Sequence, residues 1–88
     1  MKNKVLVKVY VPEFELSYDI FIPVNEYIWR VKELIIKSIN DLENLKIDLN
    51  HKFILVNKDN GTIYDNNSIV YKTDIRNASD LLLISTTM

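Results

Sequence analysis

The sequence has 88 residues, a formal net charge of −1 and no cysteine, and 48% of its residues are hydrophobic. This length and composition predict one folded domain over residues 1–88, rather than a disordered chain. The mixed charge argues against a nucleic-acid partner, and the lack of thiols excludes disulfides, thiolate metal sites and cysteine chemistry. No apolar run approaches the roughly 20 residues that span a bilayer, so we expect a cytoplasmic protein without membrane insertion.

Two strands are predicted at the start of the chain. Residues 4–11 carry valine at every second position, and residues 14–22 alternate apolar and polar side chains in the same way. A period of two with many β-branched residues is typical of strands. Pro12 cannot continue a hydrogen-bonded ladder, so we expect a turn there and a hairpin between the two strands.

Residues 25–40 form the clearest helix in the sequence. Apolar residues recur there at spacings of three and four, which places them on one stripe of a helix. They are Ile28, Val31, Ile35 and Ile39. Asn25 precedes this stripe and is a candidate N-cap. Because the other segments are mostly strands, we expect the stripe to pack on a sheet.

The second half predicts shorter elements. Residues 41–51 fit neither period, and we expect a helical turn followed by an extended return. Residues 52–57 are an apolar run typical of a buried strand, followed by the turn signal Lys-Asp-Asn-Gly. Residues 62–64 and 81–85 are the last predicted strands, with residues 69–75 irregular or a single helical turn. This order predicts an α+β, β-grasp fold: a mixed sheet of four to five strands on one helix, with the last strand beside the first and parallel to it.

The end of the sequence resembles that of ubiquitin-like proteins. Their pattern of a short strand, a loop, an isoleucine and a final strand is matched by apolar residues and one serine. These are Ile63, Ile69 or Val70, Ile75, Ser79, Leu81 and Leu83. The run KFILVNK similarly resembles the third strand of ubiquitin, with Ile54 at the place of its exposed recognition isoleucine. The resemblance implies a ubiquitin-like fold, and it says little about function because the pattern is one of packing.

A narrower resemblance covers residues 17–39, SYDIFIPVNEYIWRVKELIIKSI. This segment is similar to YukD/EsaB-type ubiquitin-like proteins of the type VII (WXG100, Ess) secretion systems of Gram-positive bacteria. The residues that carry it are Tyr18, Asp19, Ile20, Pro23, Leu34, Ile35, Ser38 and Ile39. The resemblance implies a non-catalytic adaptor or regulator of the secretion apparatus that acts by protein–protein docking. The alternative is an autonomous β-grasp domain that mainly self-associates in an unrelated assembly.

Conjugation, catalysis and cofactor binding are not expected. Ubiquitin acts through a C-terminal Gly-Gly, whereas this sequence ends in LISTTM and its only glycine is Gly61. The only histidine, His51, lies by a predicted loop and is interpreted as a solvated residue. Asp59 and Asp65 flank a turn without the dense acidic spacing of a calcium loop. The sequence also lacks a glycine-rich phosphate loop. We therefore expect neither an enzyme nor a conjugated modifier, and no metal or cofactor.

The binding surface is expected on the face of the sheet that the helix leaves uncovered. The residues predicted to face the helix are Val5, Val7, Val9, Ile20, Ile22, Phe53, Leu55, Leu81 and Leu83. Strand alternation then turns a second set outward. That set is Leu6, Lys8, Phe21, Ile54, Val56, Leu82 and Ile84. A contiguous apolar face of this kind usually marks an interaction site. The alternatives are an error in the alternation, or a cover formed by residues 41–50 or by a second copy.

A second candidate surface lies on the flank of the helix. Trp29 and Ile36 stand seven residues apart there, beside the predicted core stripe. The alternative is that Leu42, Leu45 and Ile47 fold back over both residues and leave no surface. At either surface the expected partner is a protein of the secretion machinery or a second copy of the chain.

Overall fold

The structure, a computed structural model, describes residues 3–86. In chain order its elements are β1 (Lys4–Val11), β2 (Leu16–Pro23), α1 (Ile28–Glu43), β3 (Phe53–Asn57) and β4 (Asp80–Ser85), with short 3-10 helices at Pro12–Phe14 and Val70–Lys72. Within these residues no helix has the length and apolar character needed to cross a bilayer. The last two residues, on which the expectation about the C-terminal tail partly depends, lie outside the described residues.

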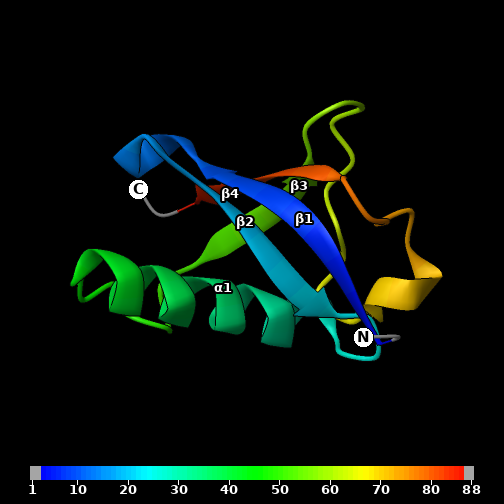
Figure 1. The fold of residues 1–88 in the computed structure, drawn as a ribbon, viewed down its shortest axis with the longest axis horizontal. Coiled ribbons are helices and arrows are strands. Elements are labelled where there is room, and N and C mark those ends of the chain that lie inside the picture. The colour runs from blue at the N-terminus through cyan, green and yellow to red at the C-terminus, as the bar shows by residue number, and fades with distance from the viewer. Residues whose placement is uncertain (1–2, 87–88) are drawn as a thin grey trace.

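The strands form one mixed sheet in the order β2-β1-β4-β3, and α1 lies on one side of it (Figure 1). β1 pairs antiparallel with β2 and parallel with β4, and β3 pairs antiparallel with β4. The predicted β-grasp fold is therefore confirmed, including the parallel pairing of first and last strands. The strand predicted at residues 62–64 is wrong, because only an isolated bridge joins Ile63 to Val56. This leaves β3 at the edge of the sheet.

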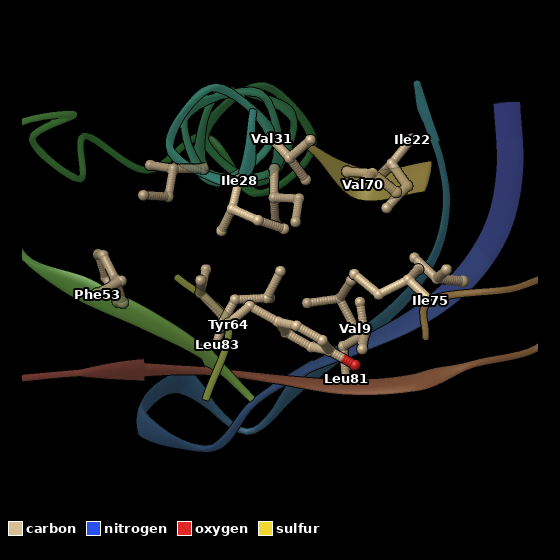
Figure 2. Packing of buried hydrophobic residues seen from close by; sticks show 14 of the residues in the cluster. Val9, Ile22, Ile28, Val31, Phe53, Tyr64, Val70, Ile75, Leu81 and Leu83 are labelled. Atoms are coloured by element: carbon tan, nitrogen blue, oxygen red, sulfur yellow. The ribbon is translucent and has the colours of Figure 1, made fainter. Parts of the chain in front are cut away.

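The core lies between α1 and the sheet, and the predicted inward faces are correct. Figure 2 shows Ile28 of α1 directed toward Val9, Leu81 and Leu83 of the sheet, and Val31 of α1 belongs to the same core cluster. All five side chains are at most 1% exposed. Burying such a side chain contributes about 1.5–3 kcal/mol relative to leaving it exposed. Of the residues predicted to face inward, only Val5 and Ile20 are partly buried rather than fully buried.

α1 begins three residues later than predicted. Its N-cap residue, Tyr27, makes no side-chain capping bond, and Asn25 lies in the turn before it. The prediction that Asn25 caps the helix is therefore wrong. The first helical N–H groups instead find backbone acceptors far along the chain: Ile28 donates to the Ser68 carbonyl at 2.9 Å, and the next residue donates to the Asn66 carbonyl at 3.3 Å. Tertiary contacts thus do the work of a local cap.

The end of α1 is organised by two asparagines. Asn44 adopts a left-handed conformation with φ 54°, which Asn tolerates better than most residues. The side chain of Asn40 then binds the returning chain: its Nδ2 donates to the Ile47 carbonyl and its Oδ1 accepts from the Ile47 N–H, both at 2.9 Å. Leu45 and Ile47 pack against the core. The chain therefore turns back as predicted, but only after Asn44, and residues 45–48 belong to neither a helix nor a strand.

Candidate protein-docking surfaces

The face of the sheet opposite α1 carries an apolar group on β1, β4 and β3. The register places Ile54 opposite Ile84 and Val56 opposite Leu82. Tyr10 of β1 is the parallel partner of Leu82. Neighbouring side chains on one face of a sheet contact each other at such positions. We call these five residues the outer apolar cluster.

Leu6 and Phe21 form a separate pair on the same face. They are partners in the β1–β2 ladder, and their side chains are 38% and 60% exposed. Lys8 lies between this pair and the outer apolar cluster, opposite Asp19 on β2 and beside Asp80 on β4. The prediction of one contiguous apolar face is therefore wrong, because this charged row crosses the sheet and divides it.

Members of the outer apolar cluster differ in exposure. Ile54, Leu82 and Ile84 are half-buried, whereas Val56 is only 7% exposed. The prediction that Val56 is open to a partner is wrong, because β4 flanks it on one side and the bridge to Ile63 on the other. Ile63 itself is 62% exposed. Its place opposite Val56 extends the outer apolar cluster past β3, and no local sequence pattern indicates this because the bridge between the two residues is a contact of the folded chain.

Of the two residues predicted to form a surface on the flank of α1, one is exposed and the other is buried. Trp29 is 45% exposed, whereas Ile36 is 2% exposed and belongs to the core. The prediction for Ile36 is wrong, because this residue packs within the core cluster. Leu42 is 66% exposed, and Leu45 and Ile47 pack against the core, so the return does not bury Trp29.

Trp29 lies at a groove of about 540 Å³ between α1 and the edge of the sheet. Lys32 lines its helical side, Phe53 lines its β3 side, and residues 49–52 also contribute to its lining. We call this space the α1–β3 groove. Across it, Lys32 Nζ donates to the Phe53 carbonyl at 2.7 Å. Burial lowers the pKa of Lys32 from its ordinary value.

The charged groups of the α1–β3 groove are mostly cationic. Glu33 is the one acidic residue in its lining, and it pairs with Arg30 at 3.1 Å. Lys32 and Lys52 form no ion pair within residues 3–86. The groove therefore carries an uncompensated positive charge, which favours an anionic ligand group.

His51, interpreted from the sequence as a solvated loop residue, is half-buried instead. Its Nε2 lies 2.6 Å from Ser85 Oγ, and its ring centroid lies 4.9 Å from that of Phe53. These contacts join the return segment to the end of β4. The prediction of a solvated loop residue is therefore wrong. The contact with Ser85 could not be read locally, because the two residues are 34 positions apart in the sequence.

Tyr64 also lines the α1–β3 groove, and hydrogen bonds hold its hydroxyl in place. Its hydroxyl donates to Asp74 Oδ1 at 2.6 Å and accepts from Asn57 Nδ2 at 3.2 Å. Burial and the hydrogen bond to Asp74 raise the pKa of Tyr64 to about 12. The same hydrogen bond is the main cause that lowers the pKa of Asp74. This network holds the segment between β3 and β4 in place.

Neither a protein-family model nor a curated protein matches this sequence. Among solved structures, it is similar to a chain of the MycP5-free ESX-5 inner membrane complex, with a TM-score of 0.75 and 15% identity over 98% of this chain. The chain spans only 22% of the length of that protein. It is also similar to the EccD5 ubiquitin-like domain from Mycobacterium xenopi, with a TM-score of 0.72 and 14% identity over 91% of each chain.

A third similar structure comes from a different kind of assembly, the toluene 4-monooxygenase HD complex with 4-bromobenzoate. Its TM-score is 0.75 at 6% identity, over 93% of this chain and 98% of that one. At such identities the likeness shows the fold alone. The fold is that of a ubiquitin-like β-grasp domain, and the same fold serves proteins of different function.

Proposed function

We propose that this chain is a cytoplasmic, non-catalytic docking module of a bacterial type VII secretion apparatus, of the YukD/EsaB type. Two observations support this choice among proteins that share the fold. Residues 17–39 resemble that family in sequence. The structural neighbours include a chain of the ESX-5 inner membrane complex and the EccD5 ubiquitin-like domain.

The outer apolar cluster is the observation that carries the docking role. α1 packs on one face of the sheet (Figure 1), and on the strands Ile54, Leu82 and Ile84 remain half-buried rather than buried. Ile54 also occupies the position that resembles the recognition isoleucine of ubiquitin. Apolar groups that stay exposed beside polar ones commonly form the centre of a protein interface.

Binding at this surface requires no chemistry from the chain. A partner would bury the exposed parts of Leu82, Ile84 and Ile54, at about 25 cal/mol per Å² of apolar area removed from water. Lys8 and Asp80 border the cluster and would orient the partner through charge complementarity, which contributes more to specificity than to affinity. The module then acts by bringing its partner into the apparatus or holding it there.

The test is a capture experiment with the membrane-complex subunits of a type VII secretion apparatus from the same organism. We expect Leu82→Asp to weaken capture at least about tenfold, since it places a charge at the centre of the cluster. Tyr71→Asp is the matched control, because Tyr71 is 55% exposed and lies outside the sheet. Thermal unfolding should show that both variants remain folded. Undiminished capture by Leu82→Asp would exclude the outer apolar cluster as the docking site.

Self-association through the same cluster is the second candidate. It predicts a stable dimer in light scattering that Leu82→Asp dissociates, and no capture of membrane subunits. Neighbouring genes for WXG-motif proteins and a membrane ATPase would favour the secretion role instead.

A further inference from the structure

β3 presents backbone hydrogen-bonding groups to the α1–β3 groove. Thr86 donates to the Lys52 carbonyl and Lys58 donates to the Asp80 carbonyl. The backbone N–H and C=O groups of the even-numbered residues in this stretch therefore point toward β4. The backbone N–H and C=O groups of the odd-numbered residues therefore point toward the open edge of the sheet. Edge strands of this kind can pair with an extended segment of another chain.

Within residues 3–86, backbone groups of the chain itself bond to one end of this edge but not to the other. Tyr64 donates to the Leu55 carbonyl at 2.9 Å, and Asn57 donates to the Thr62 carbonyl at 2.8 Å. At the other end, the Phe53 carbonyl meets no strand of the described residues, and its bond comes from Lys32 Nζ. Residues 62–64 thus cover the edge at Leu55 and Asn57, whereas at Phe53 a single side chain, that of Lys32, covers it.

The contact between Lys32 and the Phe53 carbonyl is replaceable. The ammonium has exchanged water for a neutral carbonyl without gaining a carboxylate, which leaves a half-buried cation poorly compensated. A peptide N–H can take over the carbonyl, since that is the partner a neighbouring strand normally supplies. Lys32 could then pair with an anionic side chain of the same peptide.

We propose that the α1–β3 groove binds an extended segment of a partner protein that carries a carboxylate next to an apolar side chain. Its backbone adds to β3 at Phe53, in the manner of strand addition to a sheet edge. The carboxylate binds Lys32 and Lys52, and the apolar side chain packs on Trp29. A volume of about 540 Å³ falls within the range of ligand-binding clefts, about 300–1,000 Å³.

This site adjoins the docking surface proposed above, since Ile54 lines the groove and also belongs to the outer apolar cluster. Trp29 and Lys32 belong to α1, which lies on one side of the sheet (Figure 1), and neither Leu82 nor Ile84 lines the groove. The two surfaces can therefore be tested separately. The charge of the groove favours an acidic peptide. Lys32 and Lys52 line it, and its one acidic residue, Glu33, is already paired with Arg30.

The experiment is selection of a displayed library of short random peptides on the folded chain, followed by titration of the enriched peptides. Trp29 is the only tryptophan in the sequence, so its fluorescence reports directly on the groove. We expect the enriched peptides to combine aspartate or glutamate with an aliphatic residue and to change Trp29 emission. Lys32→Met should lower their affinity at least about tenfold, Lys32→Arg should retain most of it, and Leu82→Asp should leave it unchanged.

Three results would overturn the proposal. They are a selection without enriched peptides, enriched peptides without an acidic residue, and equal affinity for Lys32→Met and the unaltered chain. Circular dichroism of Lys32→Met confirms that the variant is folded before its affinity is compared. Failure of this site leaves the capture result with Leu82→Asp unaffected, so the two proposals can fail independently.

Discussion

Asn40, near the C-terminal end of α1, joins the helix to the segment that follows it. Two hydrogen bonds of 2.9 Å join its amide to the backbone of Ile47. Asn40→Ala leaves both backbone groups without this partner, and we expect the free energy of unfolding to fall by about 1–3 kcal/mol. Lys37→Ala is the control, since Lys37 is exposed on the same helix. Denaturant unfolding measures both. Equal stability of the two variants would contradict the role of Asn40.

Tyr64 and Asp74 give the chain a defined response to acid. The hydrogen bond from Tyr64 holds the pKa of Asp74 below its ordinary value of 3.8. A carboxyl whose folded-state pKa is lowered stabilises the fold above its ordinary pKa, and this contribution is lost as the pH falls through its folded-state value. We expect Tyr64→Phe to lower the free energy of unfolding by about 0.5–1.5 kcal/mol at neutral pH, and by less in strong acid.

Unfolding of this Tyr64→Phe variant and the unaltered chain, measured at neutral pH and in acid, checks the prediction. Tyr71→Phe serves as the control, because Tyr71 is exposed away from this network. A loss of stability in Tyr64→Phe that stayed constant across this pH range would show that packing, rather than the bond to Asp74, explains the effect.

At the scale of elements, the sequence predicted what lies inside α1 but not where it begins and ends. The spacing of Ile28, Val31, Ile35 and Ile39 depends only on helix geometry, so the core stripe could be read directly. The first turn instead takes its acceptors from Ser68 and the residues before it. Such contacts arise only once the chain has folded, and no local pattern contains them.

The C-terminal end of α1 permits a direct test of backbone conformation. Asn44 has φ 54°, a region that costs residues with a Cβ about 1–2 kcal/mol and glycine almost nothing. We expect Asn44→Gly to be more stable than Asn44→Ala by about 1 kcal/mol, although alanine is the better helix former. Thermal or denaturant unfolding decides between them. A more stable Asn44→Ala would mean that the left-handed cap contributes little.

The sheet shows a similar division between what could and could not be predicted. Alternation along each strand assigned Leu82 and Leu83 to opposite faces, because the period of a strand is a local property. Register between strands is a tertiary property. Only the pairing of Lys8 with Asp19 and Asp80 reveals that charges divide the outer face. The α1–β3 groove escaped prediction for the same reason, since it joins α1, the return and β3.

At the scale of the whole molecule, the charged row explains how a β-grasp domain with exposed apolar residues can avoid binding itself. The outer apolar cluster and the pair Leu6–Phe21 are each small beside the roughly 800 Å² per partner of a stable interface. Lys8 lies between them, with carboxylates on both neighbouring strands. We therefore expect the unaltered chain to be monomeric in light scattering.

Replacing the central cation should change that state. Lys8→Leu would join the two apolar groups into one band from Phe21 to Ile84, and we expect self-association that rises with protein concentration. Lys4→Leu is the matched control, because it makes the same exchange on the same strand at its outer end. Light scattering and sedimentation measure both variants. If Lys8→Leu stays monomeric at every concentration, the separation of the two apolar groups does not control association. A dimer of the unaltered chain that Leu82→Asp dissociates would instead place the contact on this face and favour the self-associating alternative, since the charged row would then lie within the contact rather than prevent it.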